Sequence, residues 1–214
     1  MTDQTQNQAS HAEIDESITL RQEVTGIGAM IRTQPFWVFM AIVAIGIVMT
    51  FVSDAFMTER NMFNITRNLA FFGIMALGMS AVICTAGIDL SVGSLLGLCA
   101  ITLGLTMQAG WGIEAGFIVC MLTAALVGMI NGILIAYLRM APFVVTLGML
   151  AMARSIAMVL SNNKMIYEFG PDMDLFEWIG GESMLGVPNV VWVLVTLTAI
   201  FWWIWRYSTW GRWV

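Results

Sequence analysis

The sequence has 214 residues, of which 59% are hydrophobic and only 11% are charged, and its formal net charge is −5. Soluble domains carry roughly 25% charged residues, so this composition excludes a soluble globular enzyme, a disordered chain and a disulfide scaffold. Nine Lys and Arg stand against fourteen Asp and Glu without a basic cluster, which excludes a protein that binds nucleic acid. The composition predicts a polytopic membrane protein.

The first 34 residues form a polar segment that we expect to be a cytoplasmic tail. They contain two Arg against five Asp and Glu, a net charge of −3, with Gln, Asn, Ser and Thr throughout. The segment is not a signal peptide, because no basic stretch precedes a short apolar run with a small-residue cleavage site. We expect disorder over 1–16, a short helix on the membrane surface over 17–33, and a transmembrane domain over 35–214.

Long uncharged segments predict about six membrane-spanning helices in this all-α bundle. Five of them have at least about 20 residues, enough to cross about 30 Å of hydrocarbon as a helix. A sixth, 140–163, is interrupted only by Arg154. Because the apolar runs are continuous rather than alternating, they do not fit the strands of an outer-membrane barrel. The five uninterrupted segments are 33–53, 68–88, 90–113, 115–138 and 183–205.

The distribution of Lys and Arg predicts that both ends of the chain lie in the cytoplasm. With six spans, five basic residues then fall inside and three outside, namely Arg21, Arg32, Arg139, Arg206 and Arg212 against Arg60, Arg67 and Lys164. The acidic loop 164–182 would lie outside. Its aromatic residues, interleaved with carboxylates, fit either a docking rim for another protein or an interfacial loop among lipid headgroups.

The apolar segments lack the side chains that membrane-embedded enzymes use. They contain no His to act as a base and a single carboxylate, Asp89, where an aspartyl protease needs two. No phosphate-binding loop of the Gly-x-x-x-x-Gly-Lys type occurs, so this chain is not expected to hydrolyse ATP. Cys84, Cys99 and Cys120 resemble small buried hydrophobes. We therefore expect neither enzymatic activity nor catalytic residues, and neither a metal ion nor a cofactor.

The segment 86–94, Ala-Gly-Ile-Asp-Leu-Ser-Val-Gly-Ser, separates two apolar segments without an ordinary polar loop. Gly87 can adopt a positive φ and close a helix, and Asp89 or Ser91 can accept hydrogen bonds from the amides that open the next one. Two interpretations stay open. The segment is either a helix break inside the membrane, facing protein or a water-filled cavity, or a tight turn at the inner interface with Asp89 as a capping residue.

Small and polar residues inside the spans have two interpretations each. Gly97, Gly128 and Gly132 belong to Gly-xxx-Gly spacings that let helices approach closely. Asn131 and Thr146 could line a solute path or simply join helices. Arg154 lies fourteen residues after Met140, about 21 Å of helix rise, so it must snorkel outward, face an aqueous path or pair with Asp89. That pairing requires a break deep in the membrane.

Two stretches of this sequence resemble the ribose/xylose/arabinose-type permeases of bacterial ABC importers. The first is Gly-Ile-Asp-Leu-Ser-Val-Gly-Ser at 87–94, which includes Gly93 and Ser94. The second matches the same family in the same order at 131–132, 134–136, 138–139 and 142–148. Branched-chain amino-acid permeases are more distantly similar in the first motif.

The resemblance implies a bacterial inner-membrane subunit that pairs with a second permease subunit and forms a path for a pentose or related monosaccharide. It also implies a periplasmic sugar-binding protein that delivers the solute and a cytoplasmic ABC ATPase that drives alternating access. In the family, a segment like 209–214 continues into a stretch that engages the ATPase and then into further spans. We therefore expect the chain to correspond to the N-terminal two-thirds of a permease.

Two other classes of protein stay open at this stage. In an ion-coupled secondary transporter or channel, Asp89 and Arg154 would titrate or bind ions without any partner ATPase. The chain could also be a non-transporting scaffold or a non-functional truncated fragment.

Overall fold

The computed structural model describes residues 31–167 and 169–209 of the chain. The chain divides into two units, Met1–Asn61 and Met62–Val214. The described part of the first unit contains helix α3 (Gln34–Val52), which begins after Thr33 with Pro35 in its first turn and buries none of its side chains. The tail predicted for 1–16 and the surface helix predicted for 17–33 fall outside the described residues, apart from 31–33.

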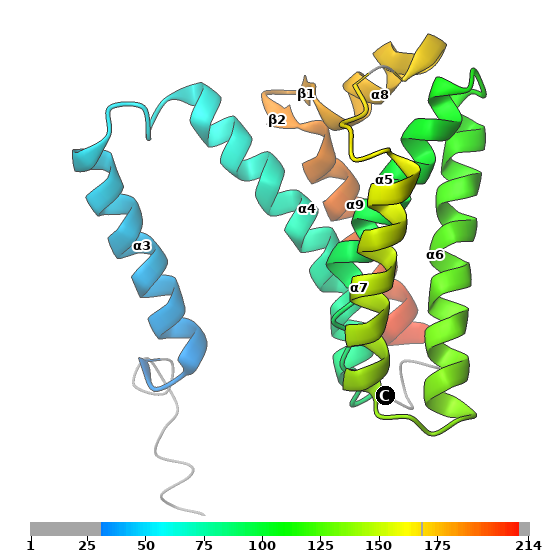
Figure 1. Cartoon of the computed structure of the whole chain (residues 1–214). Coiled ribbons are helices and arrows are strands. Elements are labelled where there is room, and N and C mark those ends of the chain that lie inside the picture. Colours follow the sequence, from blue (N-terminus) through cyan, green and yellow to red (C-terminus); the bar gives the residue numbers. More distant parts are fainter. Residues whose placement is uncertain (1–30, 168, 210–214) are drawn as a thin grey trace, which may run out of the picture. The chain divides into compact units, whose positions relative to one another are not determined.

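The second unit contains the remaining helices and one small hairpin (Figure 1). Its elements, in chain order, are α4 (Glu59–Cys84, whose first residues belong to the first unit), α5 (Val92–Gln108), α6 (Ile113–Ala136), α7 (Pro142–Leu160), the 3-10 helix η1 (Gly170–Asp172), α8 (Met173–Gly180), β1 (Ser183–Met184), β2 (Val187–Pro188) and α9 (Asn189–Tyr207).

The helices confirm an all-α polytopic membrane protein. In the described part of the chain, five helices are long and apolar enough to cross a membrane, namely α3, α4, α6, α7 and α9. The interrupted segment around Arg154 is among them, as α7. Helix α5 has only 17 residues, about 26 Å of rise, which is short of the hydrocarbon thickness. The predicted segment 90–113 loses two residues to the break before α5 and five at its other end, where α5 stops at Gln108 and α6 begins at Ile113.

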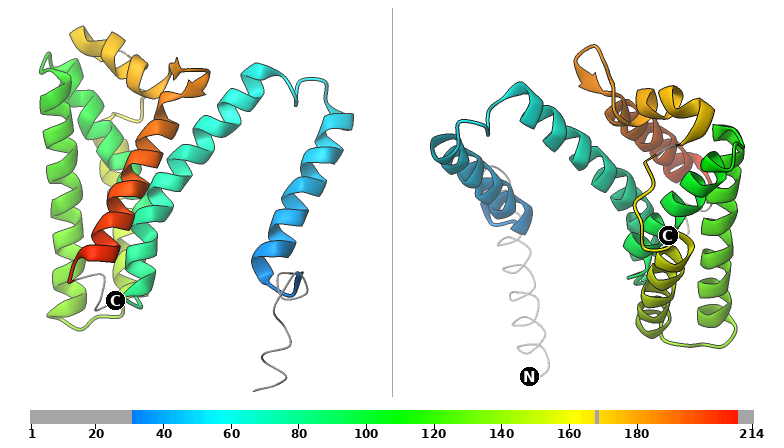
Figure 2. Two further views of the ribbon diagram at one scale, coloured as in Figure 1. Left: turned by 180° about the vertical axis from the view of Figure 1, so that it is seen from behind. Right: turned by 45° about the horizontal axis from the view of Figure 1, so that its top comes forward.

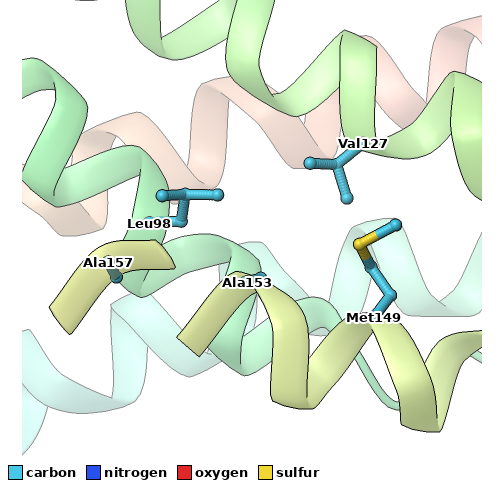
Figure 3. Packing of buried hydrophobic residues seen from close by; sticks show 5 residues of the cluster. All are labelled: Leu98, Val127, Met149, Ala153 and Ala157. Carbon is cyan, nitrogen blue, oxygen red and sulfur yellow. The ribbon is translucent and has the colours of Figure 1, made fainter. Parts of the chain in front are cut away.

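The core of the second unit lies where α5 packs between α6 and α7. Leu98 of α5 and Val127 of α6 meet three residues of α7 (Figure 3). Met149, Ala153 and Ala157 recur every four residues and therefore share one face of α7. Ala153 is completely buried, and small side chains at such positions allow neighbouring helices to approach closely.

The loop predicted to lie outside folds back onto the end of α5. Leu103, Met107 and Ile113 form a second apolar cluster, against which other side chains pack, namely Cys120, Phe169, Phe176 and Ile179. Gly170 is essential to this contact, because its φ is +73° and an added Cβ would lie 2.7 Å from the carbonyl oxygen of Met107. The aromatic residues of the loop thus serve mainly as packing groups, while Trp178 remains half exposed.

A two-stranded hairpin precedes α9, where the uncharged segment 183–205 predicts helix throughout. Ser183 pairs with Pro188 and Met184 pairs with Val187. Leu185 and Gly186 both have positive φ, as a two-residue hairpin turn requires. Helix α9 then runs beside α4 (Figures 1 and 2), where a Cβ added to Gly73 would lie 2.9 Å from Leu194.

Candidate functional site

The predicted break is closed by two backbone hydrogen bonds at the end of α4. The amide of Ala86 donates to the carbonyl of Ile83 and that of Gly87 donates to the carbonyl of Val82, each over 2.9 Å. In this motif the first of the two donors takes the left-handed conformation, and here Ala86 does so, with φ of 56°. The prediction of a positive φ at Gly87 is therefore wrong by one residue. Glycine at 87 avoids a clash instead, since a Cβ there would lie 3.1 Å from the Val82 carbonyl oxygen.

A chain of polar side chains joins the break to α6. Oδ1 of Asp89 accepts a hydrogen bond from the backbone amide of Ser91 at 2.8 Å and another from its hydroxyl at 2.6 Å. Ser91 is completely buried, and its Oγ accepts from Nδ2 of Asn131 at 3.3 Å. Because the single hydroxyl proton of Ser91 goes to the carboxylate, its Oγ can only accept from Asn131. Asp89 therefore holds the turn that precedes α5, whose N-cap residue is Ser91 and whose first amides receive no side-chain cap. A capping role for Asp89 stays a prediction.

Helix α7 holds the other side of the break. Thr146 is 1% exposed, and its hydroxyl donates to the carbonyl of Pro142 at 2.8 Å and lies 3.5 Å from that of Ile88. Thr146 lies four residues after the start of α7 and Asn131 five residues before the end of α6. These separations correspond to about 6 and 7.5 Å of helix rise. The break thus lies about one helical turn inside the end of the bundle that carries loop 137–141, rather than at its middle.

A groove of about 600 Å³ runs between α5 and α7, directly beyond the break. Leu90 of the break lines its near end. The residues of α5 that line it recur every three or four positions and so lie on one face, namely Gly93, Ser94, Gly97, Ala100 and Ile101. Helix α7 contributes Arg154, together with Leu150, Ala157, Met158 and Ser161. This groove is not among the predictions made from the sequence, although the spacing of small residues after Leu90 is a signal that predicts it.

Arg154 faces this groove and forms no ion pair with Asp89 or any other described residue. It lies eight residues beyond Thr146 on α7, about 12 Å further along the helix, whereas Asp89 lies near the level of Thr146. Of the three alternatives for Arg154, the structure therefore favours an open groove over pairing with Asp89. Asn131 and Thr146 do not line this groove, since both are buried and hold the break.

The three glycines expected to pack helices together make no close contact within the described chain, whereas other glycines do. A Cβ added to Gly97, Gly128 or Gly132 would meet no other atom of the described chain within 4 Å. Their role in packing therefore stays a prediction, now directed to a partner helix. Close contacts within this chain are made by other helical glycines, Gly73, Gly104 and Gly116, since a Cβ at any of them would lie 2.9–3.2 Å from neighbouring side chains.

Comparisons with known proteins agree with the resemblance seen in the two motifs. The family model described as "Branched-chain amino acid transport system / permease component" matches residues 61–214. The ribose import permease protein RbsC of Escherichia coli is 36% identical over 178 residues, which cover 81% of this chain and 54% of that protein. No solved structure matches.

Other curated relatives match over the same region. The RbsC protein of Haemophilus influenzae is 31% identical over 177 residues, covering 82% of this chain and 55% of the relative. The autoinducer 2 import system permease protein LsrC of Escherichia coli is 27% identical over 173 residues, covering 81% and 50%. The chain thus spans about half the length of these relatives.

Proposed function

Since this chain belongs to the family of permease components of branched-chain amino acid transport systems, we propose that it is a permease subunit of an ABC importer for a pentose or related monosaccharide. The chain is a multi-pass protein of the bacterial inner membrane. In this proposal a periplasmic sugar-binding protein delivers the solute, a second permease subunit completes the path, and a separate cytoplasmic ATPase drives alternating access. The chain itself performs no catalysis.

The residues that line the groove between α5 and α7 favour a sugar over an amino acid as the solute. Its polar groups are the guanidinium of Arg154 and the hydroxyls of Ser94 and Ser161, and Gly93 and Gly97 leave open space beside them, since no neighbouring atom lies within 4 Å of an added Cβ. These groups can donate to and accept from the hydroxyls of a neutral solute. An amino acid would also need a carboxylate for its ammonium group, and none of the residues that line this groove is Asp or Glu.

Relatives support the same substrate class. Those named above import ribose or autoinducer 2, and a ribose permease is more than one third identical to this chain over most of its length. The helix break, recessed by about one turn and held by hydrogen bonds rather than by apolar packing, provides a segment that can rearrange as the path opens and closes.

Reconstitution of the permease with its ATPase and binding protein tests the proposal. We expect ATP-dependent uptake of radiolabelled ribose or xylose into proteoliposomes, and little uptake of leucine. Arg154→Gln should lower sugar uptake about tenfold, because hydrogen bonds to a charged group contribute about 1.5–3 kcal/mol. Lys164→Gln, which removes a cation outside the groove, should leave uptake unchanged. Uptake driven by an ion gradient without ATP would instead support the ion-coupled transporter.

A further inference from the structure

A second hollow, of about 500 Å³, lies at the other end of the second unit from the break. One wall is the first half of α4, and the other consists of residues 166–167 and 169–181, which include η1 and α8. The predicted orientation places this end outside the cell. Neither the helix break nor the groove between α5 and α7 contributes a residue to it.

The lining of this hollow combines opposite charges with aromatic rings. Arg67 and Asn68 of α4 and Glu177 of α8 supply donors and acceptors. Four aromatic side chains complete this mixed surface, namely Phe71, Tyr167, Phe169 and Phe176. A few polar groups placed among aromatic side chains are typical of small-molecule sites.

The polar groups of the hollow are not satisfied by one another. Nε of Arg67 is buried and has no hydrogen-bond partner, and within the described residues Arg67 and Glu177 form no ion pair. A buried donor without an acceptor costs about 1–3 kcal/mol. An acceptor that enters the hollow, or that lets the guanidinium turn towards it, would remove this cost.

The part of this wall formed by 169–181 is held in place by contacts with α5 and α6. Phe169 packs on the cluster of Met107 and stacks against Phe176, with ring centroids 4.6 Å apart. Oδ2 of Asp172 accepts a hydrogen bond from the amide of Ile113 at 2.8 Å. Because this wall is already ordered, a ligand would bind without having to order it first.

We propose that this hollow is an outward-facing subsite for the neutral, polyhydroxylated solute of the importer, reached before the groove between α5 and α7. The assignment rests on the proposed function and adds a second binding step to it. A ligand with a net charge would be repelled by either Glu177 or Arg67, whereas sugar hydroxyls both donate and accept. An amino-acid zwitterion would also pair with both groups, so leucine is the competitor that tests the solute class. The C–H faces of a sugar ring fit against the exposed rings of Phe71 and Tyr167.

Protection of an introduced cysteine tests this subsite directly. Tyr167→Cys is placed in the assembled transporter in right-side-out vesicles and labelled with a membrane-impermeant maleimide. The unsubstituted protein reports the background from its own cysteines. Ribose at about ten times its apparent Kd should slow the labelling about tenfold, whereas leucine at the same concentration should not.

Further variants show whether protection of the cysteine comes from ligand binding in the hollow or from a change in the exposure of the loop. Arg67→Gln should abolish the protection and raise the KM for uptake about tenfold with little change in maximal rate. The matched variant Arg60→Gln, on α4 but outside the hollow, should leave both the protection and the KM for uptake unchanged. Glu182→Cys, on the same loop but not among the residues that line the hollow, should show no protection.

The possible results distinguish failure of the proposed subsite from failure of the proposed importer function. ATP-driven sugar uptake without protection of Tyr167→Cys, or with Arg67→Gln behaving as Arg60→Gln does, would overturn the subsite and leave the importer standing. Absence of any ATP-driven sugar uptake would overturn both. Protection by leucine as strong as that by ribose would refute the solute class.

Discussion

Polar side chains hold the beginning of α5, whereas apolar packing holds its end. At the beginning, Asp89, Ser91 and Asn131 form a chain of hydrogen bonds of 2.6–3.3 Å. Oδ1 of Asn131 is nevertheless buried without a donor among the described residues. At the end, Met107 is completely buried and the backbone of Gly170 lies against its carbonyl. The polar side chains at the beginning of α5 can exchange hydrogen-bond partners when the helix moves. The apolar cluster at its end can move only if a cavity opens in it.

The two ends also differ in how the preceding backbone is closed. The same pair of hydrogen bonds ends α4 at the break and α5 at its far end, where the amides of Gly110 and Trp111 donate to Met107 and Thr106. The left-handed residue is Gly110 at the far end but Ala86 at the break. For a residue with a Cβ this conformation costs roughly 1–2 kcal/mol. Backbone strain and an unsatisfied acceptor are thus concentrated at the end that faces the groove.

Truncation of Met107 should weaken the apolar end most strongly. Met107→Ala should lower the free energy of unfolding by about 2–5 kcal/mol, because it leaves a cavity in a fully buried cluster. The measurement is a denaturant titration of the purified protein in detergent. Met121→Ala, at an exposed position on α6, should change stability by less than about 0.5 kcal/mol. Equal effects of the two variants would contradict the difference between the ends of α5.

A Cβ at Gly170 should be almost as harmful. Gly170→Ala combines a left-handed backbone with a clash against the Met107 carbonyl, for a total cost of about 2–4 kcal/mol. Gly110→Ala has the same backbone conformation but open space around its Cβ, so it should cost only about 1–2 kcal/mol. The difference between their melting temperatures measures the contact of the outer loop with α5, and no difference would mean that this contact is loose.

Loss of the hydroxyl of Ser91 should have a smaller effect at the polar end. Ser91→Ala removes a partner from both Asp89 and Asn131, and we expect a loss of about 1–3 kcal/mol. Ser94→Ala, one turn further along α5 in the groove, should stay within about 0.5 kcal/mol. If Ser91→Ala were as neutral as its control, the hydrogen bonds would not be what holds the break.

The smallest of these effects should be an increase in stability, at Ala86. Ala86→Gly removes the cost of a left-handed alanine and should raise stability by about 1 kcal/mol. Ala125→Gly, at an exposed position within α6, should lower it by about 1 kcal/mol. Thermal unfolding of the two variants gives opposite shifts if Ala86 is strained, and a destabilised Ala86→Gly would show that it is not.

Much of the fold could be predicted because hydropathy is a local property. Each uncharged segment contains a helix, and the segment 86–94 does separate two of them. The uncharged segment predicts that the second span begins at 68, whereas α4 begins at Glu59 and includes Arg60 and Arg67. Charged residues at a helix end can extend to the membrane interface, so charge alone marks such a boundary poorly.

The sequence by itself determined the membrane class, the approximate spans, the position of the break and the polar residues near it. Only the tertiary structure decided that Asp89 turns to Ser91 rather than to Arg154, and that the break lies one turn inside the bundle. It also joined Asp172 to Ile113, 59 positions apart, and brought Arg67 into one hollow with Glu177. The transfer of a side chain into lipid depends on its own chemistry, whereas a hydrogen-bond partner depends on which helices pack together.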